Sequence, residues 1–282
     1  MAAIPPELQR RAVTRYAFRL HSDPLPGTIW WFLNTRVPPF DDVRVRRALN
    51  YAVDRNALVE QIGTARAVTC QILPPSFPAY RPYCPYTLNR NPAGTWTAPD
   101  LARARALVAA SRTKGMRVDA VTIDVPPAVA VGRRFVSVLR RLGYRASLRR
   151  IPPDGFFEHV GDSRNRVQIG TAGWFADTLA ASNFFQPILA CSSFIPGSAA
   201  NTNLFEYCDP KLDAKMKEAT ELQASDPVRA NELWAEVDRA ITDQAVAVPW
   251  TNRQDVVLVS SRVGNYVHHP FWGTLLDQLW VK

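Results

Sequence analysis

The sequence predicts an α/β fold, because strand-like and helix-like segments alternate in the middle of the chain. Residues 121–125 alternate between apolar and polar side chains, as a half-buried strand does. Apolar residues then recur at helical spacing from Val131 to Leu142, and residues 144–148 alternate again. A strand, a helix and a second strand in this order favour a parallel βαβ unit. Residues 167–170, leading into Trp174, predict a third strand.

Length and composition are typical of a folded protein with a sizeable core. The chain has 282 residues, of which 47% are hydrophobic and 21% charged, enough for one large or two ordinary domains. Its formal net charge is +9, but the excess is mostly arginine spread over predicted helices. This pattern favours a solvated basic surface over a functional basic patch, so no nucleic-acid partner is expected.

The N-terminal segment predicts a connector followed by a buried strand. Residues up to Thr28 are rich in proline and arginine, which is typical of an extended connector. Residues 29–33, Ile-Trp-Trp-Phe-Leu, have the length of a buried strand.

Two helices are expected next, each beginning at an aspartate. Asp41 or Asp42 can accept hydrogen bonds from the free N–H groups of the first helix, and Asp54 can cap a second helix ending near Gly63. The apolar stripe of the first helix comprises Val45, Ala48, Leu49 and Ala52. Its other face carries Arg44, Arg46 and Arg47.

Residues 71–97 predict an ordered loop rather than a helix or strand. They contain many prolines together with Tyr80, Tyr83, Tyr86 and Trp96, a pattern typical of an ordered aromatic loop. We expect the three tyrosines to pack within the loop rather than to stack on a ligand. Pro99 then suits the first position of a helix that stops at Lys114-Gly115.

The C-terminal part predicts two helices and two strands. Both helices are preceded by the pair aspartate and proline, at Asp209-Pro210 and Asp226-Pro227, where the aspartate caps and the proline occupies the first turn. Residues 246–250 and 256–259 are expected to form two separate strands.

The four cysteines form two locally spaced pairs, Cys70 with Cys84 and Cys191 with Cys208. Two loop-closing disulfides would suit an oxidising compartment, whereas four free thiols would suit the cytosol. No apolar run is long enough to cross a membrane, and the N-terminus lacks the apolar stretch of a signal peptide. Because disulfides and this missing signal indicate different compartments, an N-terminal portion is expected to be absent.

Several motifs resemble those of the family-five extracellular solute-binding proteins. The first is Phe32-Leu33-Asn34-Thr35, then Pro38-Pro39-Phe40-Asp41, then Val45-Arg46-Arg47-Ala48-Leu49 and Ala52-Val53-Asp54-Arg55. Further matches follow in order: Gly173-Trp174-Phe175-Ala176-Asp177, Asn201-Thr202-Asn203, Asp213, Arg229, Leu233 and Ala247-Val248-Pro249. The resemblance covers nearly the whole chain.

The resemblance implies a periplasmic-binding-protein type II-like C-terminal lobe plus part of the first lobe. Residues 1–36 would be a remnant of the first lobe with the crossing strand, 37–244 the C-terminal lobe, and 245–282 the return to the first lobe. The implied function is that of a non-enzymatic component of an ABC importer, extracellular, cell-surface or periplasmic. It would deliver peptides or similar solutes to a permease as a monomer, without a cofactor. Family members run to about twice this length, so the chain is expected to be truncated.

Trp174 and Asp177 are the candidate ligand-binding residues, since Asp177 matches the aspartate that pairs with the ligand's N-terminal ammonium in peptide-binding relatives. The indole of Trp174 would supply apolar contact area. The alternative is that Asp177 caps the helix containing Phe184 and Phe185. The chain departs from the relatives directly afterwards, because Thr178 to Ala181 stand where relatives often have a second aspartate and a proline.

Asn201 and Asn203 could offer amide groups to the ligand, although a role in a turn is the favoured alternative. His268 and His269 are adjacent on an extended segment and would point to opposite faces, so no metal site is expected. The common phosphate-binding, dinucleotide-binding and hydrolase signatures are absent from the sequence, which argues against an enzyme.

A second hypothesis is that the chain is the ligand-sensing C-terminal module of a larger transcriptional regulator. The missing signal peptide would suit a cytosolic sensor. The cysteine pairs argue the other way, because a cytosolic sensor would not hold disulfides.

Overall fold

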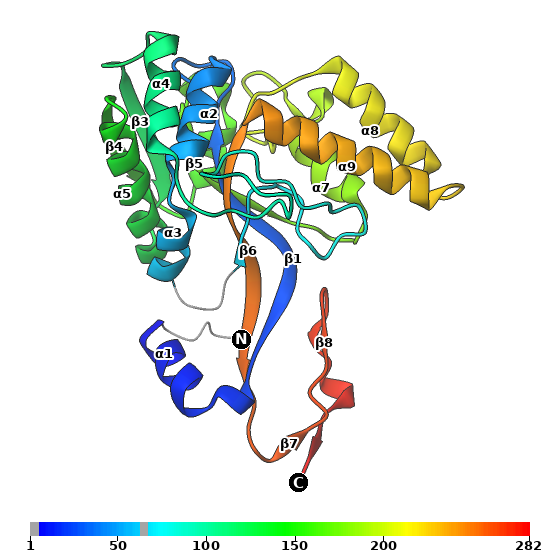
Figure 1. Ribbon diagram of the computed structural model, residues 1–282. Coiled ribbons are helices and arrows are strands. Elements are labelled where there is room, and N and C mark those ends of the chain that lie inside the picture. The colour runs from blue at the N-terminus through cyan, green and yellow to red at the C-terminus, as the bar shows by residue number, and fades with distance from the viewer. Residues whose placement is uncertain (1–5, 63–66) are drawn as a thin grey trace.

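A computed structural model describes residues 6–62 and 67–282, and its centre is a mixed six-stranded sheet (Figure 1). The strand order is β2-β6-β1-β5-β3-β4. The strands are β1 Leu20–Leu33, β2 Ala67–Val68, β3 Arg117–Ile123, β4 Arg145–Ile151, β5 Ile169–Phe175 and β6 Ala247–Leu258. Strand β3 runs parallel to β4 and β5, whereas β1 runs antiparallel to β5 and β6. The predicted α/β class and the parallel strand-helix-strand unit are confirmed.

Helices cover both faces of this sheet. In Figure 1, α2 to α5 lie on one side of the sheet, and α7 to α9 lie on the other. The helices are α1 Pro6–Arg15, α2 Val43–Ala52, α3 Arg55–Ile62, α4 Leu101–Ser111, α5 Pro126–Arg141, α6 Phe156–Gly161, α7 Ala181–Leu189, α8 Pro210–Leu222 and α9 Pro227–Gln244. The sheet is therefore buried between two layers of helices, as in other doubly covered α/β folds.

A hydrophobic core lies on each face of the sheet, and the C-terminal half of β1 contributes residues to both. It can do so because successive strand residues point to opposite faces. Trp31 stacks on Phe135 of α5 with ring centroids 4.5 Å apart. Its neighbour Trp30 packs on the other face, against Phe184 of α7 and Phe205, with centroids at 6.4 and 6.1 Å. The continuous apolar run that predicted a buried strand thus reflects burial on two sides.

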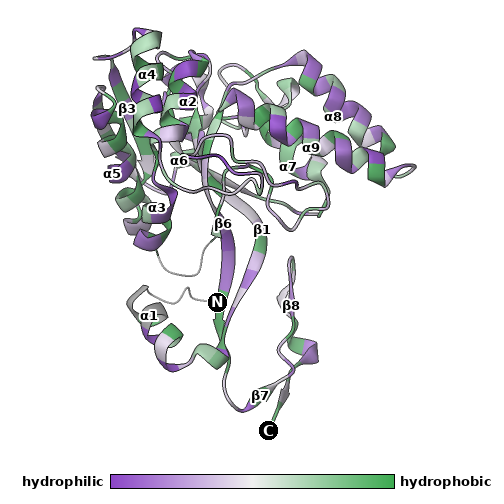
Figure 2. Cartoon of the chain, in the orientation of Figure 1, coloured by the Kyte–Doolittle hydropathy of each residue, from purple (hydrophilic) through white to green (hydrophobic). Residues whose placement is uncertain are grey.

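Strands β1 and β6 continue past the sheet as a two-stranded ribbon that leads to α1 and the C-terminal segment (Figure 1). Figure 2 shows β6 changing from hydrophobic to hydrophilic residues as it leaves the sheet. The C-terminal segment forms two small pairs, β7 Val263–Gly264 with β10 Trp280–Val281, and β8 His268–His269 with β9 Gly273–Thr274.

The predicted helix starts are mostly confirmed. The carboxylate of Asp42 accepts a hydrogen bond from the N–H of Arg44, and those of Asp209 and Asp226 do the same at α8 and α9. The cap of α4 is Asp100, so Pro99 precedes the cap instead of occupying the first turn. The end near Gly63 lies outside the described residues.

Three expectations about the chain ends were wrong. Residues 6–15 form a helix, although the whole segment up to Thr28 was expected to be a connector. Residues 20–28 lie within β1, where most of them pair with β6. The two strands expected at 246–250 and 256–259 are the single strand β6, because β1 pairs with both parts.

Arg46 is buried instead of lying on a solvated helix face, with 5% of its surface exposed. Its Nε donates to the carbonyl of Gln244 at 3.0 Å, and Nε of the next residue, Arg47, donates to that of Asp243 at 3.1 Å. These carbonyls end α9 and have no partner within the helix. Cationic side chains therefore satisfy the C-terminus of a helix that lies far away in sequence.

Both predicted disulfides are present, joining Cys70 to Cys84 and Cys191 to Cys208. The first closes part of the long irregular loop predicted over 71–97, which contains no helix or strand. Tyr83 and Tyr86 of this loop are buried, and their hydroxyls donate to the side chain and carbonyl of Asp243. The expected packing of the loop aromatics is confirmed for these two residues.

Candidate ligand-binding site

A cavity of about 400 Å³ lies on the sheet face that carries Trp30. Its floor is formed by β1 and β5. Trp30 of β1 pairs directly with Ala172 of β5, and Trp174 lies two residues further along β5 on the same face. Its walls come from α6, α7 and the segment before Phe205. The complete lining is Trp30, Phe157, Glu158, Ala172, Gly173, Trp174, Ile188, Ala199, Ala200, Asn201, Thr202, Leu204 and Phe205.

Trp174, the first predicted ligand-binding residue, lines this cavity and is held by one hydrogen bond. Its indole Nε1 donates to the main-chain carbonyl of Asn183, at 3.0 Å. The Asn183 side chain in turn accepts a hydrogen bond of 2.7 Å from the N–H of Asp177. Asn183 thereby fixes the end of β5 against the first turn of α7, and it sets the position of both candidate residues.

Asp177 is exposed, and its carboxylate makes no hydrogen bond or ion pair with any residue in the described part of the chain. The capping alternative does not describe this structure, because α7 begins after Ala180 and has no side-chain cap. The Asp177 carboxylate is therefore free to accept hydrogen bonds from a bound group.

Asn201 lines the cavity, but its amide is used within the protein. Its Nδ2 donates to three main-chain carbonyls, of Gly161, Ile195 and Ser198, at 2.8 to 2.9 Å. Its Oδ1 accepts from the N–H of Ile195 at 2.7 Å. These bonds hold the wall of the cavity in one conformation, which is the turn role that the sequence offered as the alternative.

Asn203 is fully buried and does not belong to the lining. Its Nδ2 donates to the carbonyls of Ala190 and Tyr207, at 3.3 and 2.8 Å. Asn203 thus ties together the two ends of the loop that the Cys191–Cys208 disulfide closes. The structure brings Trp174 and Asn201 into one cavity, with Asp177 three residues beyond Trp174, and leaves Asn203 outside it.

Sequence reasoning missed the apolar walls of the cavity and the role of Gly161, which contacts the wall segment closely. Phe157, Leu204 and Phe205 had no motif to mark them, because they meet the floor only after folding. At Gly161 an added Cβ would lie 2.7 Å from the carbonyl oxygen of Ala199. Glycine therefore permits the close contact between α6 and the wall segment.

Charge near the cavity comes from α6. Glu158 lines the cavity, and among the described residues it is the only one of the lining whose side chain is ionisable. Burial lowers the pKa of the neighbouring His159, and so does the nearby positive charge of Arg149. The imidazole of His159 is therefore mostly neutral at pH 7.

The described residues contain no group of three or more His, Cys, Asp or Glu side chains arranged to hold a metal ion. His269 is occupied within its own turn, where Nδ1 accepts from the N–H groups of Phe271 and Trp272, both at 3.2 Å. None of the helices in 6–62 and 67–282 combines the length and the apolar character of a membrane-spanning segment.

The sequence matches one protein-family model, "Bacterial extracellular solute-binding proteins, family 5 Middle", over residues 1–195. The probable di/tripeptide-binding protein 5 of Pseudomonas aeruginosa is 25% identical over 90% of this chain and 46% of its own length. The periplasmic oligopeptide-binding protein OppA of Escherichia coli is 24% identical over 94% of this chain and 46% of its own length. The chain thus spans about half the length of these curated relatives.

Solved structures show the same arrangement of elements. The clavulanic acid biosynthesis oligopeptide binding protein 2 superposes with a TM-score of 0.85 and 25% identity, over 98% of this chain and 50% of that protein. The dipeptide binding protein of Pseudoalteromonas sp. SM9913, in complex with Met-Leu, gives a TM-score of 0.74 at 21% identity, over 98% and 56%. The second likeness concerns the fold alone.

Proposed function

Because this chain belongs to the bacterial extracellular solute-binding proteins of family 5, we propose that it is the solute-binding part of an ABC importer for peptides or similar solutes. Its fold is that of the type II periplasmic binding proteins, as the sequence predicts. Similar proteins are described as binding dipeptides, tripeptides or oligopeptides. The protein acts by binding and release, with no chemical step.

One observation carries the proposal, namely the free carboxylate of Asp177 three residues after Trp174, which lines the cavity. A carboxylate without an internal partner can form a charge-assisted hydrogen bond with the ammonium group of a peptide. Asp177 follows the end of β5 in the bend before α7, and three residues of chain span at most about 10 Å, so one peptide can reach from Asp177 to Trp174. The apolar cavity then takes the part of the ligand that follows the amino group.

We propose the division into 1–36, 37–244 and 245–282, with the middle part as the C-terminal lobe. The pairing of β1 with β6 supports it, because these strands leave the helix-covered body together and lead to α1 and the C-terminal segment (Figure 1). The intact protein would place the ligand between this lobe and a second one, which close by hinge bending. The 282 residues then make up about half of that protein.

An exported location, with an ABC permease as partner and a monomeric state, completes the proposal. The two disulfides support export, since such bonds persist in oxidising compartments. They argue equally against the ligand-sensing module of a cytosolic regulator. Non-reducing mass spectrometry separates the two, because the regulator requires four free thiols.

Isothermal titration of the 282-residue chain with Ala-Ala-Ala, free or N-acetylated, tests the role of Asp177. Asp177→Asn removes the charge and keeps the shape, so we expect about ten-fold or more weaker binding of the free peptide. N-acetylation should weaken binding to the unmodified chain by a similar factor.

Asp154→Asn is the matched control, because Asp154 is exposed and does not line the cavity. Equal affinities of the unmodified chain and Asp177→Asn for the free peptide would remove Asp177 from the site. Absence of binding by both peptides would contradict peptide binding by this chain.

A further inference from the structure

The cavity lined by Trp174 is mostly apolar, although the chain carries a formal net charge of +9. Four aromatic rings border it, those of Trp30, Phe157, Trp174 and Phe205. The aliphatic contribution comes from Ile188 and Leu204 and from the small residues around them. Only Glu158 adds an ionisable group, so a charged side chain entering the cavity would find no cationic partner and at most one anionic one.

Small residues create the free volume. Ala172 on the floor, and Ala199 and Ala200 on the wall, border about 400 Å³ of space with small side chains. This volume falls within the usual range of small-molecule sites, roughly 300 to 1,000 Å³. An apolar group that fills it removes both its own surface and that of the aromatic rings from water.

The walls are fixed before any ligand arrives. The four hydrogen bonds of the Asn201 amide join the wall segment to itself and to α6. The Cys191–Cys208 disulfide closes the chain on either side of this segment. Trp174 is held by its bond to Asn183. A preformed cavity costs little conformational entropy on binding and selects by shape.

We propose that this cavity receives a bulky uncharged side chain, aromatic or branched aliphatic, of the peptide whose amino group Asp177 binds. This inference rests on the proposed function and names the ligand class of that same site. The carboxylate of Glu158 adds a second criterion, because it belongs to the lining and repels acidic side chains. The site therefore prefers peptides with one large apolar residue and rejects those with Asp or Glu in its place.

Fluorescence or calorimetric titration of the 282-residue chain with three series of tripeptides tests this preference. Each series places Phe, Lys or Glu in turn at the first, second and third position of an Ala-Ala-Ala background. At one position we expect the Phe peptide to bind about ten-fold or more tightly than both charged counterparts, as burial of one aromatic side chain implies. The Glu peptide should be the weakest of the three.

Two variants fill the cavity from different sides. Ala172→Leu places a larger side chain on the floor, beside Trp30. Ala200→Phe places one on the wall, and because Ala200 is exposed this change should disturb the core less. Both should abolish most of the preference for the Phe peptide over the Lys and Glu peptides. Ala214→Leu is the matched control, because Ala214 lies in a separate groove between α7 and α8.

The outcomes separate the inference from the proposed function. Equal binding of the Phe, Lys and Glu peptides at all three positions would overturn the inference and leave peptide binding standing. A Phe preference that survives in both cavity-filling variants would also overturn it, since the preference would then arise elsewhere. Absence of binding by every peptide, Ala-Ala-Ala included, would overturn the proposed function and the inference together.

Discussion

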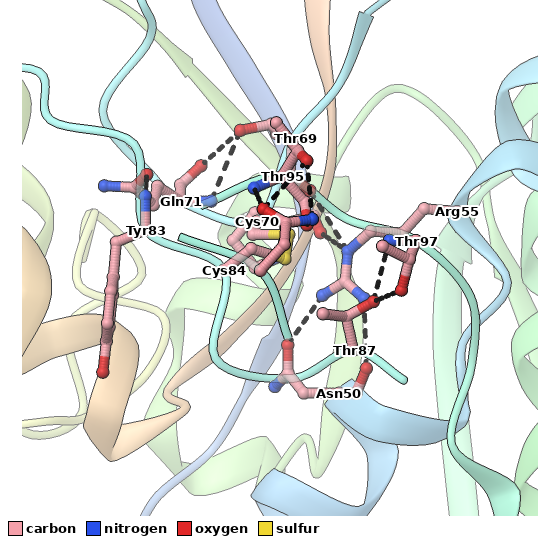
Figure 3. Close-up of a disulfide and its surroundings, with 12 residues drawn as sticks. Asn50, Arg55, Thr69, Cys70, Gln71, Tyr83, Cys84, Thr87, Thr95 and Thr97 are labelled. Atoms are coloured by element: carbon pink, nitrogen blue, oxygen red, sulfur yellow. Dashed lines mark hydrogen bonds between the residues drawn. A yellow bond between two sulfur atoms is a disulfide. The ribbon is translucent and has the colours of Figure 1, made fainter. Parts of the chain in front are cut away.

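The guanidinium of Arg55 donates two hydrogen bonds to Asn50, one to its main-chain carbonyl and one to its side-chain oxygen, both at 3.0 Å (Figure 3). The Nε of Arg55 donates to the carbonyls of Thr69 and Pro249, at 3.1 and 2.8 Å. Arg55 is fully buried, and burial lowers its pKa. One side chain thus joins two helices, the start of the long loop and β6.

Replacing Arg55 by methionine should therefore destabilise the fold strongly. Arg55→Met keeps much of the volume but leaves buried carbonyl groups without donors, which costs about 3 kcal/mol or more of unfolding free energy. Urea denaturation followed by circular dichroism measures the change. Arg133→Met is the control, because Arg133 is exposed on α5 and should stay within about 0.5 kcal/mol. Equal midpoints for the two variants would contradict the prediction.

Asp238 should make stability fall as the pH rises from weakly acidic to neutral. Its carboxyl is buried in α9, accepts from the side chain of Gln71, and has its pKa raised by burial from 3.8 to about 7. The folded state therefore binds a proton that the unfolded state releases, so the stabilisation is complete below about pH 4 and is lost as the pH rises through about 7.

The variant Asp238→Asn removes this titration while keeping the shape of the side chain. Relative to the unmodified chain, the variant should gain roughly 2 to 4 kcal/mol between pH 4.5 and pH 8. Urea denaturation of both proteins at both pH values measures the change in unfolding free energy. Other carboxylates titrate in the same way in both proteins, so their contributions cancel in the comparison. A difference that does not change with pH would show that Asp238 stays in one protonation state.

The two disulfides should have separable effects. Serine at both Cys191 and Cys208 opens a loop that spans the cavity wall, and serine at both Cys70 and Cys84 opens a loop of similar length that does not line the cavity. Each pair of substitutions should lower stability by about 3 kcal/mol. Only the first should weaken peptide binding, measured by titration under conditions where both variants are folded. Loss of affinity in both would mean that the loops act on binding only through overall stability.

Alanine variants of Asn201 and Asn203 should both lose stability but should differ in their affinity for peptide. Alanine at either position leaves buried carbonyls unpaired and should cost about 1 to 3 kcal/mol of unfolding free energy. Asn201→Ala frees the wall and should weaken binding more than Asn203→Ala does, because Asn203 is outside the lining. Titration of both variants with the tightest-binding peptide makes the comparison. A larger loss of affinity in Asn203→Ala would assign the ligand contact to that residue instead.

Features that depend on neighbours in sequence could be predicted from the chain alone. Asp42, Asp209 and Asp226 cap their helices because the acceptor and the N–H group lie two or three residues apart. The alternating and helical spacings on either side of Gly143 likewise encode the parallel unit of β3, α5 and β4. The helix at Pro6–Arg15 carried its own signal, a proline followed by helix-forming residues, but the nearby prolines and arginines obscured it.

Features that depend on residues far apart in sequence could not be predicted from the chain alone. The extension of β1 to Leu20 exists because residues 254–258 supply its hydrogen bonds. The burial of Arg46 follows from the position of the last turn of α9, almost 200 residues later. Sequence motifs marked Trp174 and Asp177, yet nothing local indicated that Phe157 and Phe205 would complete a cavity around the indole.

The sequence by itself determined the family, the α/β class and most helix starts, and it indicated which cysteines could pair, because each of these is carried by residues close together in the chain. The tertiary structure decided which polar groups are free. It used the amides of Asn201 and Asn203 internally, left the carboxylate of Asp177 without a partner among the described residues, and enclosed an apolar space beside Trp174. Whether a polar group is available to a ligand depends on what surrounds it after folding, and only long-range packing sets those surroundings.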